Sequence, residues 1–238
     1  MCISEQVSWI VLGSGVTVGA AAIGIPPQKN VPEILFIFSY LFSLLMQFHD
    51  GMRWRQVAGK SSFLSPKTLA HVGYMLNVLQ PVVLGILTIV WLGYVVTTKK
   101  EKHNTIPRYA IPRLLIATAL VVMYVVCVLG ISNPNVMPSP LSCKHHIQYP
   151  WWKEGRTFNK ILYVVVLLGL LAVLFADDPP FGGIVIGYTI AVLLISMFMD
   201  HKANASLWCL LFAGAPLLLI VKKIKLAIEN TRSHTYSV

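Results

Sequence analysis

The sequence predicts an all-α integral membrane protein, a single domain over residues 1–238 made of a bundle of seven transmembrane helices. Hydrophobic residues make up 56% of the chain and charged residues only 12%, whereas a soluble domain has about 25% charged residues. The apolar residues form runs of the length needed to cross a ~30 Å hydrocarbon core, roughly 20 residues each. Seven such runs and their connections use up the whole chain, so we expect a multi-pass membrane protein without a soluble domain.

Prolines and polar residues divide the chain into the seven expected helices. These lie at about 6–25, 31–50, 69–96, 109–131, 157–177, 181–200 and 204–224. Two prolines, Pro81 and Pro216, fall inside the third and seventh helices. Each removes a backbone hydrogen bond, which membrane helices tolerate when neighbours satisfy the freed carbonyl. We therefore expect kinks at both.

The basic residues predict contact with lipid headgroups. The formal net charge is +10, but the lysines and arginines lie in the short connections, where they anchor a protein against anionic lipids. No soluble basic surface remains for nucleic acid, so the lipid bilayer is the expected partner. Basic residues are divided almost evenly between the two faces, which leaves the orientation of the termini open.

Helices one to three share features with helices five to seven. Pro26-Pro27 and Pro179-Pro180 end the first and fifth expected helices, and Pro81 and Pro216 lie at the same distance from the starts of the third and seventh. This pattern suggests a 3+1+3 parallel repeat, an arrangement found in transporters that bind substrate between two halves. Coincidence is the alternative, and the sequence does not decide between them.

Three amide side chains form the candidate substrate-binding site: Gln47, Asn77 and Gln80. Asn77 and Gln80 share one face of the third helix just before Pro81. An amide in hydrocarbon needs a hydrogen-bond partner. Gln80 and Asn77 either hold the third helix to the second through Gln47, or face a cavity and bind a small polar solute or ion.

Histidines and carboxylates gather at one predicted membrane face. His49-Asp50 closes the second expected helix, His71 opens the third, and Asp200-His201 closes the sixth. The connection between the fourth and fifth helices adds His145-His146. Imidazole and carboxylate together can bind a metal or relay protons, while ordinary interfacial residues are the simpler interpretation. The sequence has no two histidines four residues apart, a spacing that would strengthen the metal hypothesis. No cofactor is predicted.

A disulfide between Cys2 and Cys143 is a further hypothesis, since both fall on the same predicted face. It requires that this face is oxidising.

Short motifs along most of the chain resemble a family of uncharacterised multi-pass membrane proteins of giant DNA viruses and algae. They are Met1-Cys2-Ile3-Ser4, Met46-Gln47, Gln80-Pro81, Tyr149 to Trp152, and Ser206-Leu207-Trp208-Cys209. The resemblance implies a viral or algal origin and no particular activity.

The preferred function is a carrier or channel-like protein with its polar site between the two helical halves. Two alternatives stay open: a structural protein of a viral or organellar membrane, and a membrane-embedded metal-dependent hydrolase. Enzymatic activity is therefore undecided. A homo-oligomer is also allowed, because Gly15-x-x-x-Gly19 and Gly183-x-x-x-Gly187 are small-residue faces that permit close helix contact.

Overall fold

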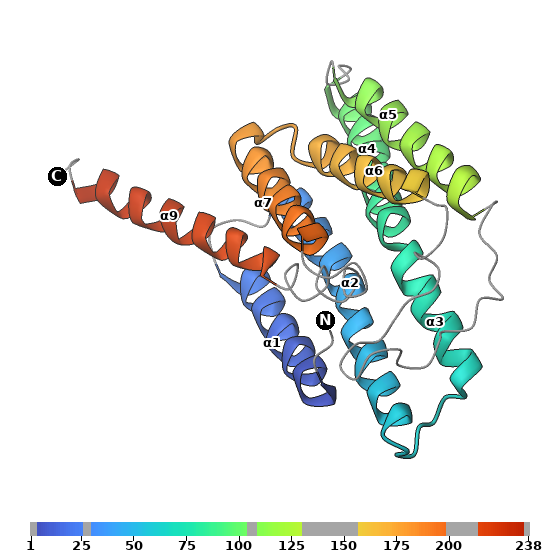
Figure 1. The fold of residues 1–238 in the computed structure, drawn as a ribbon. Helices are drawn as coiled ribbons and strands as arrows, with labels where there is room; N and C mark the ends of the chain where they lie inside the picture. The colour runs from blue at the N-terminus through green and yellow to red at the C-terminus, as the bar shows by residue number, and fades with distance from the viewer. Residues whose placement is uncertain (1–3, 26–29, 104–108, 130–156, 199–213, 236–238) are drawn as a thin grey trace.

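A computed structural model describes residues 4–25, 30–103, 109–129, 157–198 and 214–235, and all regular structure in these ranges is helical (Figure 1). Four segments are long and apolar enough to cross a membrane. They are α1 (Glu5–Gly24), α2 (Val31–Val57), the Gln80–Thr98 part of α4 (Gln80–His103), and Ala110–Cys127, formed by α5 (Ala110–Tyr124) and the short π-helix η1 (Val125–Leu129). The other helices are α3 (Pro66–Val78), α6 (Thr157–Leu174), α7 (Pro179–Phe198) and α9 (Ala215–Thr235). The expectation of an all-helical bundle with several possible membrane crossings is confirmed.

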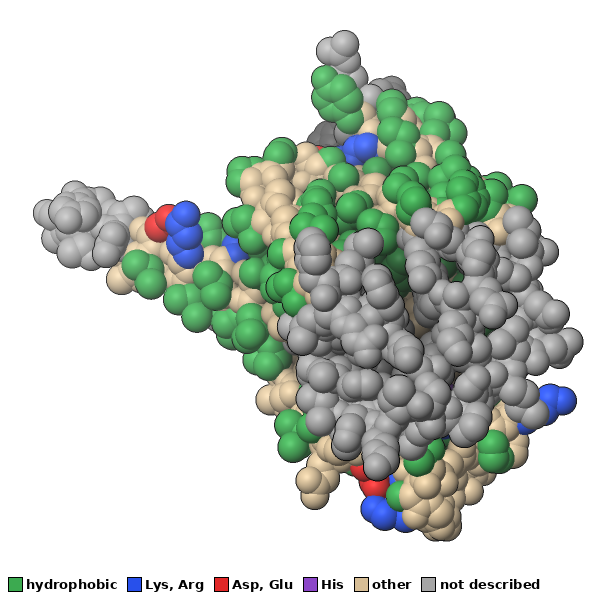
Figure 2. All heavy atoms as spheres, in the orientation of Figure 1, with side chains coloured by type: hydrophobic (Ala, Val, Ile, Leu, Met, Phe, Trp, Pro, Cys, Tyr) green, Lys and Arg blue, Asp and Glu red, His purple; other side chains and the backbone are tan. Residues whose placement is uncertain are grey.

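Large apolar side chains cover much of the surface, as expected where lipid is the solvent. Figure 2 shows hydrophobic side chains gathered over the upper part of the molecule and along α9. Exposed examples lie on all the helices that could cross a membrane, such as Ile10, Phe38, Val90, Leu115 and Val126.

Helices α1 and α2 form an antiparallel hairpin with ion pairs at both ends. Gly15 and Gly19 of α1 lie against α2: a Cβ added at Gly15 would lie 2.7 Å from Leu44 and Tyr40, and one added at Gly19 would lie 3.2 Å from Leu41. At one end Glu5 pairs with Arg55 and Lys60, at 3.1 and 2.7 Å. At the other end Glu33 opens α2. The 20 residues of α1 correspond to about 30 Å of helix, close to the thickness of the hydrocarbon core. The "Glu5 face" and the "Glu33 face" below denote these two ends.

The third expected helix is broken into α3 and α4 at Leu79, next to Pro81. Pro81 is the second residue of α4, where its missing N–H costs little. The Tyr124 hydroxyl of α5 donates to the Val78 carbonyl at 3.0 Å, so a neighbouring helix supplies a donor where the chain is interrupted. The expected distortion at Pro81 is confirmed.

Helix α2 continues two turns past its expected end at residue 50 and stops at Val57, just before Gly59, whose φ is +69°. His49 and Asp50 therefore lie inside the helix and not at its end, which corrects the expected placement. The charged residues after the apolar run suggested a membrane boundary, but the helix carries on until a glycine allows a left-handed turn. Similarly, α3 begins at Pro66, so His71 lies within its second turn.

The last helix also differs from expectation. Within the described residues it begins at Ala215 and runs to Thr235, about ten residues beyond the predicted end. Pro216 is its second residue, and residues 204–213 of the expected seventh helix lie outside the described residues, so a kink at Pro216 stays a prediction. Ala215 and Leu219 are buried, where α9 packs against α1, α2 and α7. Its second half projects away from the other helices (Figure 1).

Candidate functional site

Four polar side chains form a stripe along the buried side of α2: Ser39, Ser43, Gln47 and Asp50. Spacings of four, four and three residues place them on one helix face. Ser43 Oγ donates to the Ser39 carbonyl at 3.1 Å, satisfying its own proton. The stripe extends over eleven residues, about 16 Å of helix. A polar stripe of this length inside a span is costly to maintain in hydrocarbon, which makes it the leading candidate site.

The stripe ends at a buried acid–base pair. His49 Nδ1 lies 3.3 Å from Asp50 Oδ1, and the two side chains are 2% and 0% exposed. The imidazole rests on the backbone of α3 at Gly73, where an added Cβ would lie 2.3 Å from His49 Nε2. Glycine is therefore required at this contact. Six residues separate His49 from Arg55, so the pair lies about 9 Å of helix rise inside the Glu5 face.

Gln80 lies at the start of α4 and is 3% exposed. Its Oε1 accepts a hydrogen bond of 2.5 Å from the Tyr163 hydroxyl of α6. Its Nε2 is buried and has no partner among the described residues. Gln80 also lines a cavity of about 10 Å³ together with Ser39, Tyr40 and Ser43. This is room for about one water molecule, and it joins Gln80 to the α2 stripe.

The other two predicted site residues lie nearby in the fold. Gln47 is buried within the α2 stripe, and its Nε2 has no partner in the described part of the chain. Asn77 is buried in the last turn of α3, next to the break. The partner found for Gln80 is Tyr163 and not Gln47, so its hydrogen bond joins α4 to α6 instead of holding it to α2.

The predicted metal ligands are only partly described. His49 and Asp50 are buried together, whereas His71 is exposed on α3. Within the described ranges no group of three His, Cys, Asp or Glu side chains could hold a metal ion. His145, His146, Asp200 and His201 lie outside the described residues, as do Cys2 and Cys143 of the predicted disulfide.

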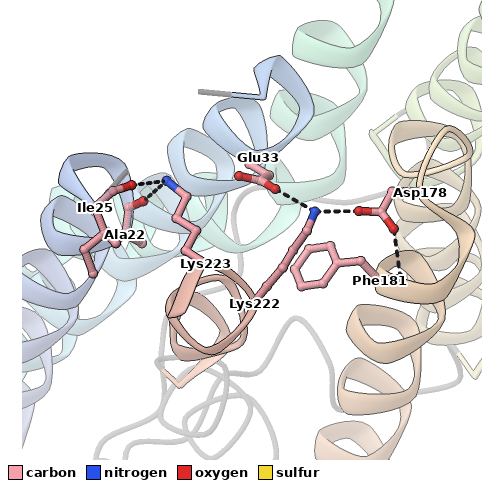
Figure 3. Close-up of polar contacts among 7 residues, drawn as sticks. All are labelled: Ala22, Ile25, Glu33, Asp178, Phe181, Lys222 and Lys223. Atoms are coloured by element: carbon pink, nitrogen blue, oxygen red, sulfur yellow. Dashed lines mark hydrogen bonds and ion pairs between the residues drawn. The ribbon is translucent and has the colours of Figure 1, made fainter. Parts of the chain in front are cut away.

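A second polar cluster lies at the Glu33 face (Figure 3). Lys222 Nζ of α9 lies 2.7 Å from Glu33 Oε1 and 2.5 Å from Asp178 Oδ2. Asp178 also accepts from the Phe181 N–H at 3.3 Å and so caps α7. Burial would lower the pKa of Lys222, but its bonds to Asp178 and Glu33 outweigh this and raise it. One ammonium thus ties together α2, α7 and α9.

Some of these residues could not be identified from the sequence. Ser39 and Ser43 look like small residues of an apolar helix, although their spacing to Gln47 was a usable signal. Tyr163 and Lys222 reach partners 83 and 189 residues away in sequence. No local pattern indicates those contacts.

No protein-family model, curated protein or solved structure matches this chain.

Proposed function

We propose that this chain is a multi-pass membrane protein that carries or conducts a small polar solute or ion. The proposed site is the α2 stripe where it meets α3 and α4. The observation that carries the proposal is the pair of buried amide nitrogens, Gln47 Nε2 and Gln80 Nε2, which lack partners among the described residues. Leaving such a donor unsatisfied costs about 1–3 kcal/mol. A polar ligand or a file of water molecules would satisfy them.

The finer architecture belongs to the same proposal: seven crossings in a 3+1+3 parallel repeat. Pro81 and Pro216 each occupy the second position of a helix, α4 and α9. The packing has a matching pattern, since α4 contacts α6 and α9 contacts α1. If α6–α9 repeats α1–α4, then α6 corresponds to α1 and α9 corresponds to α4, so these two contacts are equivalent. The shorter apolar stretches of α6 and α7 would then be crossings, and a seventh would end near Lys222.

A structural role in a viral or organellar membrane is the second candidate. The specific observation in its favour is the size of the cavity at Gln80, about 10 Å³, which admits no solute larger than water. A carrier in this conformation would be closed and would have to open before a solute binds. The viral or algal origin implied by the short motifs is part of this second candidate.

Flux through the purified protein in proteoliposomes tests the proposal. We expect wild-type protein to pass protons, sodium, potassium or a small uncharged polar solute, and Gln80→Leu to lose that flux. Thr118→Val is the matched control. Thr118 is exposed on α5, and its hydroxyl donates to the Leu114 carbonyl of its own helix. No flux of any of these probes would overturn transport. Equal flux in wild type and Gln80→Leu would overturn the site while leaving transport intact.

A further inference from the structure

The small cavity beside Gln80 has the polar partners that a water molecule needs. Ser39 and Ser43 of the α2 stripe line it from one side, and Gln80 lines it from α4. Gln80 Oε1 already accepts from the Tyr163 hydroxyl, whereas its buried Nε2 has no partner among the described residues. One amide donor and two serine hydroxyls are therefore available there, and a buried water makes two to four hydrogen bonds.

The size of the cavity limits which solutes fit. Its volume of about 10 Å³ corresponds to one water molecule. Neutral solutes such as urea or glycerol have several non-hydrogen atoms and need a larger space.

The charge of the α2 stripe also favours a neutral ligand. Gln47 Nε2 and Gln80 Nε2 lack partners in the described part of the chain, and an N–H donor is satisfied by an acceptor oxygen and not by a metal cation. An anion would need a cation beside it. The stripe ends instead at the pair His49–Asp50, whose acid and base offset each other, and the buried Lys223 is bound to carbonyls at the end of α1. A neutral acceptor fits this environment best.

The spacing of the stripe matches a chain of water molecules. Ser39, Ser43 and Gln47 follow one another at intervals of four residues, which is about 6 Å of helix rise. A water molecule bonded to two neighbours spans two hydrogen bonds of about 2.8 Å each, so a single water bridges each interval. We propose that the α2 stripe and Gln80 conduct water in single file. This inference rests on the proposed transport function and names water as its small polar solute.

An aromatic stack closes the file toward the Glu33 face. Phe36 lines the cavity and is 1% exposed. Its ring centre lies 5.7 Å from that of Phe175, which lies 5.3 Å from that of Phe181. Lys222 Nζ, shown in Figure 3, lies 4.4 Å from the centre of the Phe181 ring. The three rings thus form a continuous contact from the cavity to the ion cluster, and shortening Phe36 should open the file at this end.

Osmotic water permeability of proteoliposomes tests the proposal, measured by stopped-flow light scattering after a step to high sucrose concentration. We expect wild-type vesicles to shrink faster than protein-free vesicles, and Phe36→Ala vesicles to shrink faster still. Phe38→Ala is the matched control and should equal wild type, because Phe38 is 53% exposed on another side of α2. Gln80→Leu removes the open donor and should return the rate to that of protein-free vesicles.

Fluxes of other solutes in the same vesicles separate this inference from the transport proposal. Flux of sodium, potassium or protons with water permeability no higher than in protein-free vesicles would overturn the water file and leave transport intact. Glycerol passing as fast as water would do the same. Equal water permeability in wild type and Gln80→Leu would also overturn the file, and this comparison decides alone if Phe36→Ala does not fold. Absence of every flux, water included, would overturn both.

Discussion

The hydrogen bond between Tyr163 and Gln80 is the interior contact whose removal is easiest to interpret. Tyr163→Phe keeps the ring in place and removes only the hydroxyl that donates to Gln80 Oε1 at 2.5 Å. Gln80 is 3% exposed, and the adjacent cavity of about 10 Å³ leaves little room for replacement water. Because Nε2 already lacks a partner in the described part of the chain, the variant leaves the whole amide unsatisfied there. We expect a loss of about 1–3 kcal/mol of stability.

Gln80→Leu should cost less, although it removes the same hydrogen bond. Leucine fills most of the same volume and eliminates the unpartnered Nε2 donor, so the two effects largely cancel. Replacing a buried polar pair by apolar groups can be nearly neutral. We therefore expect the double variant to be close to Gln80→Leu alone, so that the coupling energy between the two sites equals the cost of Tyr163→Phe, about 1–3 kcal/mol.

Thermal unfolding in detergent measures this double-mutant cycle. In a chain of this length, each kcal/mol of stability shifts the unfolding midpoint temperature by about 2 to 4 °C. Tyr94→Phe is the control, because Tyr94 is an exposed residue of α4 and its hydroxyl should contribute little. Additive effects of Tyr163→Phe and Gln80→Leu would refute the reasoning. So would a Gln80→Leu protein less stable than Tyr163→Phe, since it would mean that Gln80 is held by more than this one bond.

Three further predictions address the two faces and the α2–α3 contact. Lys222→Met leaves two carboxylates without their ammonium and should lower stability by about 2 kcal/mol, whereas the exposed Lys225→Met should change it by less than about 0.5 kcal/mol, both measured by unfolding. Gly73→Ala places a methyl group 2.3 Å from His49 Nε2 and should cost about 1–3 kcal/mol; Gly93→Ala, which meets nothing within 4 Å, should be neutral or slightly stabilising. Tags at the two ends of the chain should differ in protease accessibility in sealed vesicles, and equal accessibility would contradict seven crossings.

Hydropathy located most of the helices because each one must present a long apolar surface. The α1, α2 and α7 starts agree with expectation within two residues. Hydropathy failed to place His49-Asp50 inside a helix. A charged pair at the end of an apolar run has the same local sequence pattern whether the pair meets water or packs against a buried glycine of another helix. The deciding neighbour, Gly73, lies in α3. Only the packed structure shows that these side chains are inside.

The same reason explains why the partners of polar residues were missed. Asn77 and Gln80 could be identified as unusual from their position before Pro81, since an amide in a span always needs an explanation. Their partners depend on which helices become neighbours. Lys222 looked like an anchor for lipid headgroups, but it binds Glu33 and Asp178. A basic residue at a membrane face can serve either purpose, and sequence does not separate them.

The polar residues divide into two groups with different expected consequences. Those at the ends of the bundle are paired: Glu5 with Arg55 and Lys60, and Lys222 with Glu33 and Asp178. They hold α1, α2, α7 and α9 together at levels about 30 Å apart along the helices. Those between the two levels include amide donors that have no partner among the residues the structure describes, and such donors do not stabilise this conformation. Because the ends hold the frame, polar groups in the interior can be changed without unfolding the bundle. Loss of flux in a stable Gln80→Leu protein would therefore report on the site itself.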